Sequence, residues 1–327
     1  MLVQVHAGDS TKAIGAELTT LDVVRSPRAF TNAAADNEER ARAVQPGYYR
    51  LRLRMSGADA VGLLLDPRSR VGQLEIKGGV QLDDTRGPDG VTTPGVLTLL
   101  SKATCTSLNG ASTCISPEQL RQAMATTTPS QLGVPEWAQA GVAKADPRRR
   151  LEGLLAPGRY DIRPGSNAQD ALRTVVSSSA SQYEAMGVAS ATGKYSPYQL
   201  LIIASLVEKE GITPDFGKIA QVIFNRLGQR VRLELDSTVN YPLDLQAVRT
   251  SSTDRGKAGA YNSYLNYGLP PTPIGAPGQR AVRATLDPEK GPWMFFVRCQ
   301  RDGTSCFATT LGAHEDNVRD AVRVGAF

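Results

Sequence analysis

The feature that most constrains this chain is the apolar run from Leu200 to Val207, which is followed within three residues by two glutamates. Ser196, Pro197 and Gln199 precede the run in the pattern of a helix start: an N-cap, a first-turn proline and a capping box. Gly211 supplies a natural stop. Because the run is apolar on nearly every side, it predicts a buried helix. A carboxyl group at the end of such a helix is costly unless it has a purpose.

The two glutamates are not equivalent. Glu210 lies three and seven positions after Val207 and Ile203, which places it on the apolar face and at the negative end of the helix dipole. Desolvation and the dipole both raise the pKa of this carboxyl, and a carboxyl that stays protonated near neutral pH is a general acid. Glu208 shares a face with Ala204 instead. The alternative is that both glutamates are solvated at a frayed helix end.

Length and composition indicate a globular protein of two or three domains, since the chain has 327 residues, 41% of them apolar and 21% charged. The net charge of +5 suits an acidic polymer or an anionic surface. The basic residues are scattered, however, and the run Arg148–Arg150 has no interleaved aromatic residues, so we expect a solvated loop and no nucleic-acid partner. No apolar run is long enough to span a bilayer.

Four cysteines form two close pairs, each around a turn-forming segment. Cys105 and Cys114 bracket one segment, and Cys299 and Cys306 bracket the other. Zinc would need tighter spacing or more histidines, so two local disulfides and an extracytoplasmic, oxidising compartment are the expectation. The alternative is four reduced thiols in a cytosolic protein.

The pattern of elements predicts an α+β fold in three parts. Residues 1–75 read as a β-α-α-β unit, which is more often a binding module than a catalytic one. Residues 76–165 form a middle α/β region, and residues 166–327 form a mixed α+β domain that holds the apolar helix.

The last part is the best specified. A second helix follows Thr213–Asp215, a strand is expected over Val231–Leu235, and a hairpin near Trp293 leads to a final helix. The segment Gly268–Gly278 is too rich in proline and glycine for regular structure, and we expect either a cleft wall or a rigid connector there.

Motifs for familiar catalytic chemistries are missing. His6 and His314 are the only histidines, no nucleophilic triad or nucleotide-binding glycine pattern is present, and we expect no cofactor and no metal. Glu210 remains, with Asp236 as the only other carboxylate near a predicted strand end. A hydrolysing glycosidase normally needs two carboxylates. One can suffice when the substrate supplies its own nucleophile, as the C6 hydroxyl of N-acetylmuramic acid can.

At this point the sequence resembles a known family. Residues 204–210 (ASLVEKE) are similar to the A-S-(I/L)-(I/V)-E-K-E signature of the endolytic murein transglycosylases, the MltG/YceG-like family. The likeness covers roughly residues 196–320, and Glu152-Gly153 upstream also fits it. Its further motifs, in order, are VIFNRL from Val222, LELDSTVNY from Leu233, AYNSY from Ala260, GLPP from Gly268 and IGAPG from Ile274.

The resemblance implies lytic cleavage of the β-1,4 bond between N-acetylmuramic acid and N-acetylglucosamine, with Glu210 as acid and then base. It implies a LysM-like peptidoglycan-binding unit at the N-terminus, a membrane anchor upstream of this chain, and an extracytoplasmic location in the cell envelope. Peptidoglycan glycan strands are the expected substrate and peptidoglycan synthases (penicillin-binding proteins) the expected partners, because the family is thought to terminate growing strands. The residues expected to orient sugar and acid are Asn225, Asp236, Thr238, Tyr241, Tyr261, Asn262 and Tyr264, with support from Glu208 and Arg226.

Two other functions stay open. One is a non-catalytic peptidoglycan-binding scaffold in which Glu210 is inert. The other is a hydrolytic muramidase that uses Asp236 as its second carboxylate. The chemistry of the cleaved ends separates all three.

Overall fold

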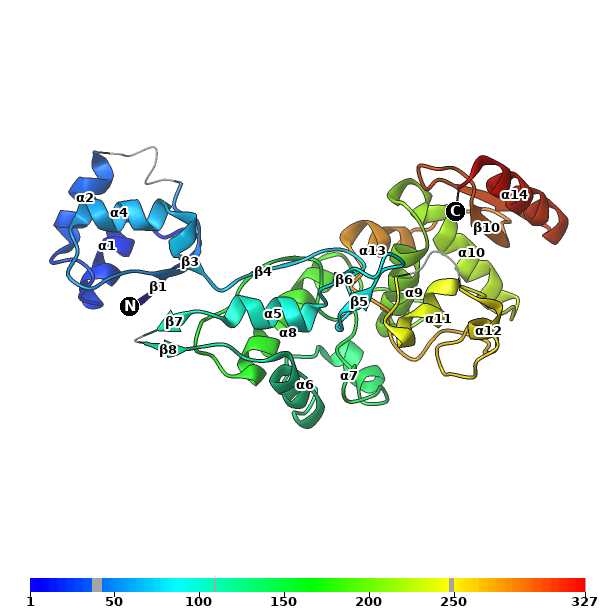
Figure 1. Cartoon of the computed structure of the whole chain (residues 1–327), viewed down its shortest axis with the longest axis horizontal. Coiled ribbons are helices and arrows are strands. Elements are labelled where there is room, and N and C mark those ends of the chain that lie inside the picture. The colour runs from blue at the N-terminus through cyan, green and yellow to red at the C-terminus, as the bar shows by residue number, and fades with distance from the viewer. Residues whose placement is uncertain (37–42, 109, 247–249, 327) are drawn as a thin grey trace. The chain divides into compact units, whose positions relative to one another are not determined.

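The computed structural model describes residues 1–36, 43–108, 110–246 and 250–326 (Figure 1). Helices and small sheets mix throughout, so the fold is α+β, as predicted. The chain forms two compact units, and residues 76–165 contribute to both. The first unit comprises Met1–Glu75, Leu99–Leu120 and Arg159–Ala171, and the second comprises Ile76–Thr98, Arg121–Gly158 and Leu172–Phe327.

The first unit is built on a three-stranded antiparallel sheet in the order β1-β2-β3. Val3 of β1 faces Tyr49 of β2, and both side chains are buried. The first helices of this unit start at serine caps, as Ser10 shows by accepting the N–H of Ala13. Up to residue 76 the elements are β1 (Leu2–Val5), α1 (Thr11–Thr20), α2 (Pro27–Ala35), β2 (Gly47–Arg50), α4 (Gly57–Leu65), η1 (Pro67–Ser69), β3 (Arg70–Val71) and β4 (Gln73–Ile76).

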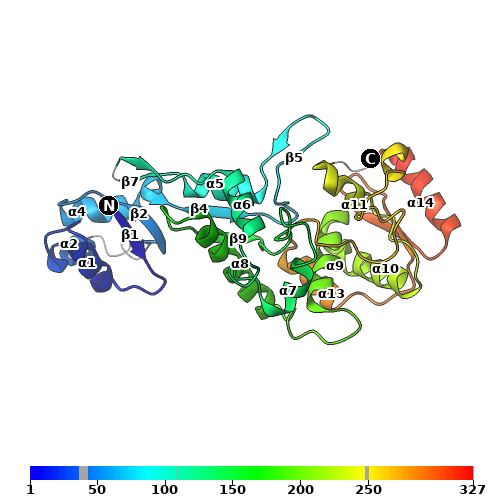
Figure 2. The same ribbon diagram turned by 90° about the horizontal axis from the view of Figure 1, so that it is seen from below.

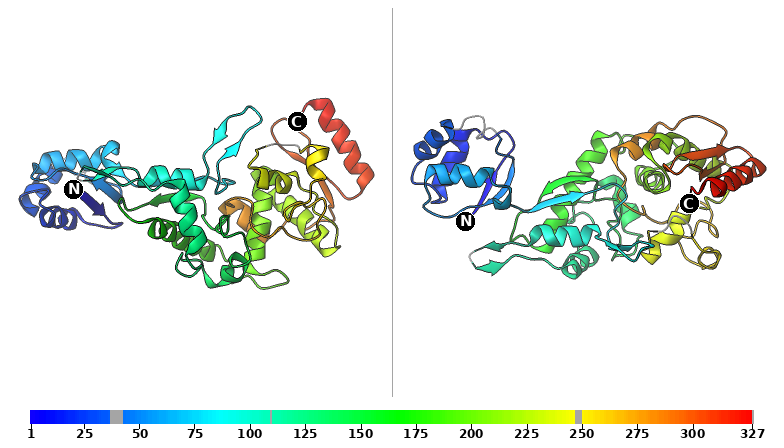
Figure 3. Two further views of the ribbon diagram at one scale, coloured as in Figure 1. Left: turned by 60° about the horizontal axis from the view of Figure 1, so that its bottom comes forward. Right: turned by 45° about the horizontal axis from the view of Figure 1, so that its top comes forward.

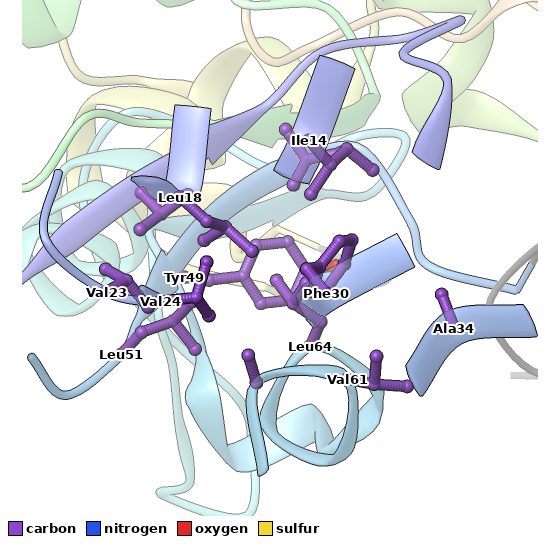
Figure 4. Close-up of a cluster of buried hydrophobic side chains, with 13 residues drawn as sticks. Ile14, Leu18, Val23, Val24, Phe30, Ala34, Tyr49, Leu51, Val61 and Leu64 are labelled. Carbon is purple, nitrogen blue, oxygen red and sulfur yellow. The ribbon is translucent and has the colours of Figure 1, made fainter. Parts of the chain in front are cut away.

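An apolar core joins the sheet of this unit to its helices. Figure 4 shows Phe30 of α2 and Tyr49 of β2 among aliphatic side chains that include Leu18 and Leu64. Leu18 is fully buried and Phe30 is 2% exposed. Burial of this kind is the main stabilising contribution to a unit of this size.

The central part of the chain alternates helices with short two-stranded pairs. A disulfide joins Cys105 to Cys114 across the small β7–β8 hairpin, as predicted. The elements are β5 (Thr85–Arg86), β6 (Thr92–Thr93), α5 (Val96–Thr104), β7 (Ser107–Leu108), β8 (Ala111–Ser112), α6 (Pro117–Thr126), α7 (Glu136–Val142), β9 (Gly158–Asp161), which pairs with β4, and α8 (Ala168–Ala185).

The second unit is organised around helix α9, which packs against α10 and α13 (Figure 2). Ile203, Leu206 and Val207 of α9 are fully buried in its core. From α9 onward the elements are α9 (Pro197–Glu210), η2 (Thr213–Asp215), α10 (Phe216–Gly228), α11 (Asp236–Asn240), η3 (Tyr241–Leu243), α12 (Ser252–Arg255), α13 (Gln279–Leu286), β10 (Phe295–Arg298), β11 (Ser305–Ala308) and α14 (Leu311–Val324).

Helix α9 begins and ends where the sequence predicts. The side chain of Ser196 accepts the N–H of Gln199, and the side chain of Gln199 accepts the N–H of Ser196, which completes the capping box. Gly211 follows the last helical residue. These local contacts fix the helix, and therefore the position of Glu210 at its end.

The strand predicted over Val231–Leu235 is wrong, because this segment is irregular and leads directly into α11. Glu234 has a φ of 53°, in the left-handed region, which interrupts an extended strand. The carbonyls of Arg232 and Leu233 accept hydrogen bonds from the Arg226 guanidinium rather than from a neighbouring strand. The alternating apolar residues therefore belong to an irregular segment, which hydrogen bonds from the Arg226 side chain hold in place.

The C-terminal part of the second unit is the antiparallel hairpin β10–β11 with helix α14 packed on it (Figure 3). A second disulfide joins Cys299 to Cys306 across this hairpin, also as predicted. The hairpin holds Phe295 to Arg298 in a fixed register, with Arg298 opposite Ser305.

Candidate active site

A cavity of about 780 Å³ lies in the second unit, and every residue that lines it belongs to that unit. The end of α9 forms one wall, the start of α11 another, and the β10–β11 hairpin with α14 a third. Its lining residues are Gln81, Lys209, Glu210, Gly211, Arg226, Leu233, Glu234, Leu235, Asp236, Ser237, Asn240, Leu245, Gln246, Arg255, Tyr264, Phe295, Phe296, Val297, Arg298, Leu311, His314 and Val318.

Glu210 is a half-buried residue of this cavity wall, at the last position of α9. Burial raises the pKa of its carboxyl to about 7, and the negative charge of Asp236 acts in the same direction. Hydrogen bonds from Ser237 and the positive charge of Lys209 oppose this rise. A carboxyl with a pKa near 7 can give and take a proton at neutral pH.

Ser237 is the direct partner of Glu210. Its hydroxyl donates a short hydrogen bond to Oε1 of Glu210, and its backbone N–H lies 3.4 Å from the same oxygen. Leu235 precedes α11 in an extended conformation, and its N–H is held by the hydroxyl of Ser263. The first turn of α11 is thereby fixed against the end of α9.

Asp236 also lines the cavity, with its carboxylate held on both oxygens. Arg255 donates to it twice, from Nε at 3.0 Å and from Nη2 at 2.8 Å, and the Tyr264 hydroxyl donates at 2.7 Å. The N–H of Thr250 donates to it at 3.2 Å. These four donors stabilise the ionised carboxylate beside Glu210 and engage both of its oxygens.

The hydrogen bond to Asp236 also affects the pKa of Tyr264. Burial raises the pKa of its phenol, as does the hydrogen bond that it donates to Asp236. The Arg255 guanidinium lies 4.8 Å from the centre of the Tyr264 ring. Asp236, Arg255 and Tyr264 therefore form one rigid polar cluster in the cavity wall.

A second acidic residue, Glu152, is buried near Lys209. It is 2% exposed, it accepts the Tyr241 hydroxyl at 3.0 Å, and it accepts the N–H of Leu82. Burial raises the pKa of its carboxyl to about 7, opposed by these donors and by the charges of Lys209 and Arg149. Burial lowers the pKa of Lys209, and its glutamate neighbours raise it.

Glu208 is held outside the cavity lining. Its carboxylate accepts the N–H of Gly278 at 3.0 Å, and a Cβ atom at Gly78 would lie 2.4 Å from it. Burial raises the pKa of this carboxyl, and the Gly278 hydrogen bond lowers it. The segment Gly268–Gly278 thus packs against α9, where Ser205 also accepts the N–H of Ile274.

Among the other predicted site residues, Arg226 and Tyr264 line the cavity with Asp236, whereas Asn225, Thr238 and Tyr241 do not. The amide of Asn225 donates to the carbonyls at 291 and 293, and Thr238 bonds to Ser263 and the carbonyl at 235. The Arg226 guanidinium donates to Glu234 and to carbonyls at 232, 233 and 294.

Tyr261 and Asn262 also lie outside the lining. The hydroxyl of Tyr261 pairs with Thr272, and its ring centre lies 4.8 Å from that of Tyr241. The amide of Asn262 donates to the carbonyls at 255 and 257, which orders the turn that carries Arg255. In this structure these side chains support the loops behind Asp236 and Arg255.

Ser237, Arg255 and Arg298 are cavity residues that sequence reasoning did not single out. Ser237 follows Asp236 inside the LELDSTVNY motif, so its position was a usable signal. Arg255 ends the short helix α12 and Arg298 ends β10, and no residue pattern separates them from surface arginines.

Among the described residues no helix is both long and apolar enough to cross a membrane. Within the same ranges, no group of three or more histidine, cysteine, aspartate and glutamate side chains is placed to hold a metal ion.

The α+β fold and a half-buried acid in a polar cavity define a protein with a site suited to general acid–base chemistry. The chain belongs to the YceG-like family, whose sequence model matches residues 3–320. A crystal structure of a yceG-like protein from Listeria monocytogenes is similar, with a TM-score of 0.62 and 24% identity over 97% of this chain and 98% of that one. That likeness shows a shared fold.

Curated relatives align with about half of this chain. The chain is 32% identical over 166 residues to the endolytic murein transglycosylase of Bacillus subtilis strain 168, covering 50% of this chain and 46% of the relative. It is 28% identical over 181 residues to the protein of the same name from Streptococcus pneumoniae serotype 2 strain D39, covering 54% and 33%. The chain thus spans less than half the length of these relatives.

Proposed function

We propose that this protein is an endolytic peptidoglycan transglycosylase that cleaves the β-1,4 bond between N-acetylmuramic acid and N-acetylglucosamine, with Glu210 as acid and base. The observation that carries the proposal is a carboxyl of raised pKa, about 7, set in the wall of a cavity of about 780 Å³. The names of the curated relatives support the choice of substrate.

The proposed reaction needs one titrating carboxyl. Protonated Glu210 gives its proton to the glycosidic oxygen as the bond from C1 to that oxygen breaks. The C6 hydroxyl of the muramoyl residue then attacks C1, and the Glu210 carboxylate accepts the hydroxyl proton. A 1,6-anhydromuramoyl end and a free 4-hydroxyl result, Glu210 is protonated again, and no water is consumed.

The neighbours of Glu210 suit this cycle. Ser237 donates to one oxygen of the carboxyl, and the Asp236 carboxylate, paired with Arg255, lies nearby. A fixed anion stabilises the positive charge that develops at C1 in the transition state. We infer that Arg255 and Tyr264 hold that anion in place.

Hydrolysis with Asp236 as second carboxylate is the other enzymatic candidate, since Asp236 lines the same cavity as Glu210. Its oxygens, however, already accept four hydrogen bonds, from Arg255 twice, Tyr264 and Thr250. A base that must activate water needs a free lone pair directed at that water. The arrangement therefore favours the lytic reaction.

We further propose that residues 1–75 act as a LysM-like unit that binds peptidoglycan. We also infer that the protein works outside the cytoplasm, anchored to the plasma membrane and close to peptidoglycan synthases whose growing strands it terminates. The two disulfides support an oxidising compartment.

The test is mass spectrometry of uncrosslinked glycan strands after incubation with the unmodified protein, with Glu210→Gln and with Glu208→Gln. We expect anhydromuramoyl ends from the unmodified protein and from Glu208→Gln, and a loss of at least a hundredfold in Glu210→Gln. Reducing ends that disappear in Asp236→Asn would establish a hydrolase instead. Intact strands from every variant would favour the binding scaffold.

A further inference from the structure

The cavity contains positive charge that its own acids do not neutralise. Of the four basic residues in its lining, Arg226 pairs with Glu234 and Arg255 pairs with Asp236. Lys209 lies among glutamates at the end of α9. Arg298 is different, because it forms no ion pair with any residue in the described ranges.

The Arg298 side chain has a defined place. It lies at the end of β10, and its guanidinium rests against the hairpin turn at Gly303. A Cβ atom at residue 303 would lie 3.3 Å from Nη2 of Arg298 and 3.0 Å from the Ile212 side chain. Gly303 has a φ of 96°, so glycine suits both this backbone conformation and this close approach. Arg298 thus lines the cavity from the end of β10, and its guanidinium lies close to the hairpin turn.

The charge balance indicates an anionic ligand. The acids in the lining are Glu210, Glu234 and Asp236, and the last two are already paired. Glu210 is largely uncharged below pH 7, since its pKa is about 7. An arginine that lines a cavity without an ion pair can bind a planar carboxylate, because its N–H groups match both oxygens.

Resting on the proposed function, we propose that Arg298 binds a carboxylate carried by the muramoyl side chain of the substrate. The sugar rings of a glycan strand are neutral, so its carboxylates belong to the stem peptide or, where the peptide has been removed, to the lactyl group. Phe296 and Val297 line the cavity next to Arg298 and offer apolar contacts to the methyl groups of that side chain. Arg298 therefore determines which strands bind.

Binding to protein that cannot cleave tests this directly. In a Glu210→Gln background, calorimetry compares three glycan fragments: one with free stem-peptide carboxylates, one with those carboxylates amidated, and one without peptide that exposes the lactyl carboxylate. We expect Arg298→Gln to weaken binding of a carboxylate-bearing fragment about tenfold and to leave the amidated fragment unchanged. The fragment that loses affinity identifies the source of the carboxylate.

Matched variants keep the result interpretable. Arg319→Gln removes an exposed arginine of α14 that pairs with Asp316, and it should bind all three fragments like the parent protein. Arg298→Lys keeps the charge and should retain part of the affinity. Equal losses for free and amidated fragments, no loss, or no binding of any fragment would overturn the subsite. If the fragments bind with the expected selectivity but the unmodified protein does not cleave glycan strands, only the proposed reaction would be overturned.

Discussion

The hydroxyl of Ser237 donates a hydrogen bond to Oε1 of Glu210, although the two residues are 27 positions apart in the chain. The N–H of Ser237 approaches the same oxygen at 3.4 Å. Since both donors engage Oε1, the acidic proton of Glu210 is left to Oε2. In the proposed reaction, the start of α11 therefore selects which oxygen of Glu210 carries the acidic proton.

Removing this donor should change the titration of the acid as well as the rate. Hydrogen bonds from Ser237 lower the pKa of Glu210. Ser237→Ala should therefore raise that pKa and shift the alkaline limb of the pH–rate profile to higher pH. We expect kcat to fall about tenfold, because the acid is also less well oriented. Ser237→Thr keeps the hydroxyl and should restore the profile. An unchanged alkaline limb in Ser237→Ala would show that the contact has only a structural role.

The pH dependence of the unmodified protein follows from the raised pKa of Glu210. In the proposed reaction the protonated form of Glu210 is the acid. Because its pKa is about 7, kcat/KM should be highest below pH 7 and fall as pH rises through 7. The measurement is the rate of strand cleavage between pH 5.5 and 9. At the alkaline end, kcat/KM should fall on the order of tenfold for each pH unit. Glu208→Gln should show the same limb, because Glu208 lies outside the cavity lining. A flat profile across pH 7 would contradict Glu210 as the titrating acid.

Local signals in the sequence explain why α9 could be predicted in detail. The capping box, the proline and Gly211 act within a few residues, and the apolar period placed Glu210 on the face of Val207, which is fully buried. The strand predicted over Val231–Leu235 failed for the opposite reason. Its alternating residues are held by Arg226 and Ser263, contacts that a periodic pattern does not encode.

The partners of Glu210 depend on contacts between distant parts of the chain. Asp236 lies near the end of the predicted strand, but the arginine that pairs with it lies 19 positions away, at the end of the short helix α12. Glu152 was noticed only through its motif, and its contact with Tyr241 spans 89 positions. Such pairs follow from tertiary packing, so the sequence predicted the position of Glu210 at the end of α9 and not the contacts that surround it.

Glu152 should make stability depend on pH. In the folded protein its pKa is about 7, above the ordinary value of 4.5. The stabilisation that comes from the protonated form is therefore fully present below pH 4.5 and is lost as pH rises through 7. In a Glu210→Gln background, the free energy of unfolding should fall by about 1.4 kcal/mol per pH unit across this window. Denaturant unfolding between pH 5 and 8 measures the slope, which Glu152→Gln should reduce, while Glu208, whose pKa is also raised by burial, still contributes to it. An equal slope in both proteins would assign the titration to another group.

The disulfide between Cys299 and Cys306 should stabilise the hairpin that carries one wall of the cavity. Replacing both cysteines by serine should lower the free energy of unfolding by about 2 kcal/mol, because the open chain gains entropy when the short loop is released. Substrate affinity should fall as well, since Phe295 to Arg298 line the cavity from β10. The same change at Cys105 and Cys114, which lie in the first unit, should leave cleavage by the second unit unchanged. Thermal unfolding and strand-cleavage assays on both double variants measure these effects, and equal losses of cleavage in the two would refute a specific role for the β10–β11 hairpin.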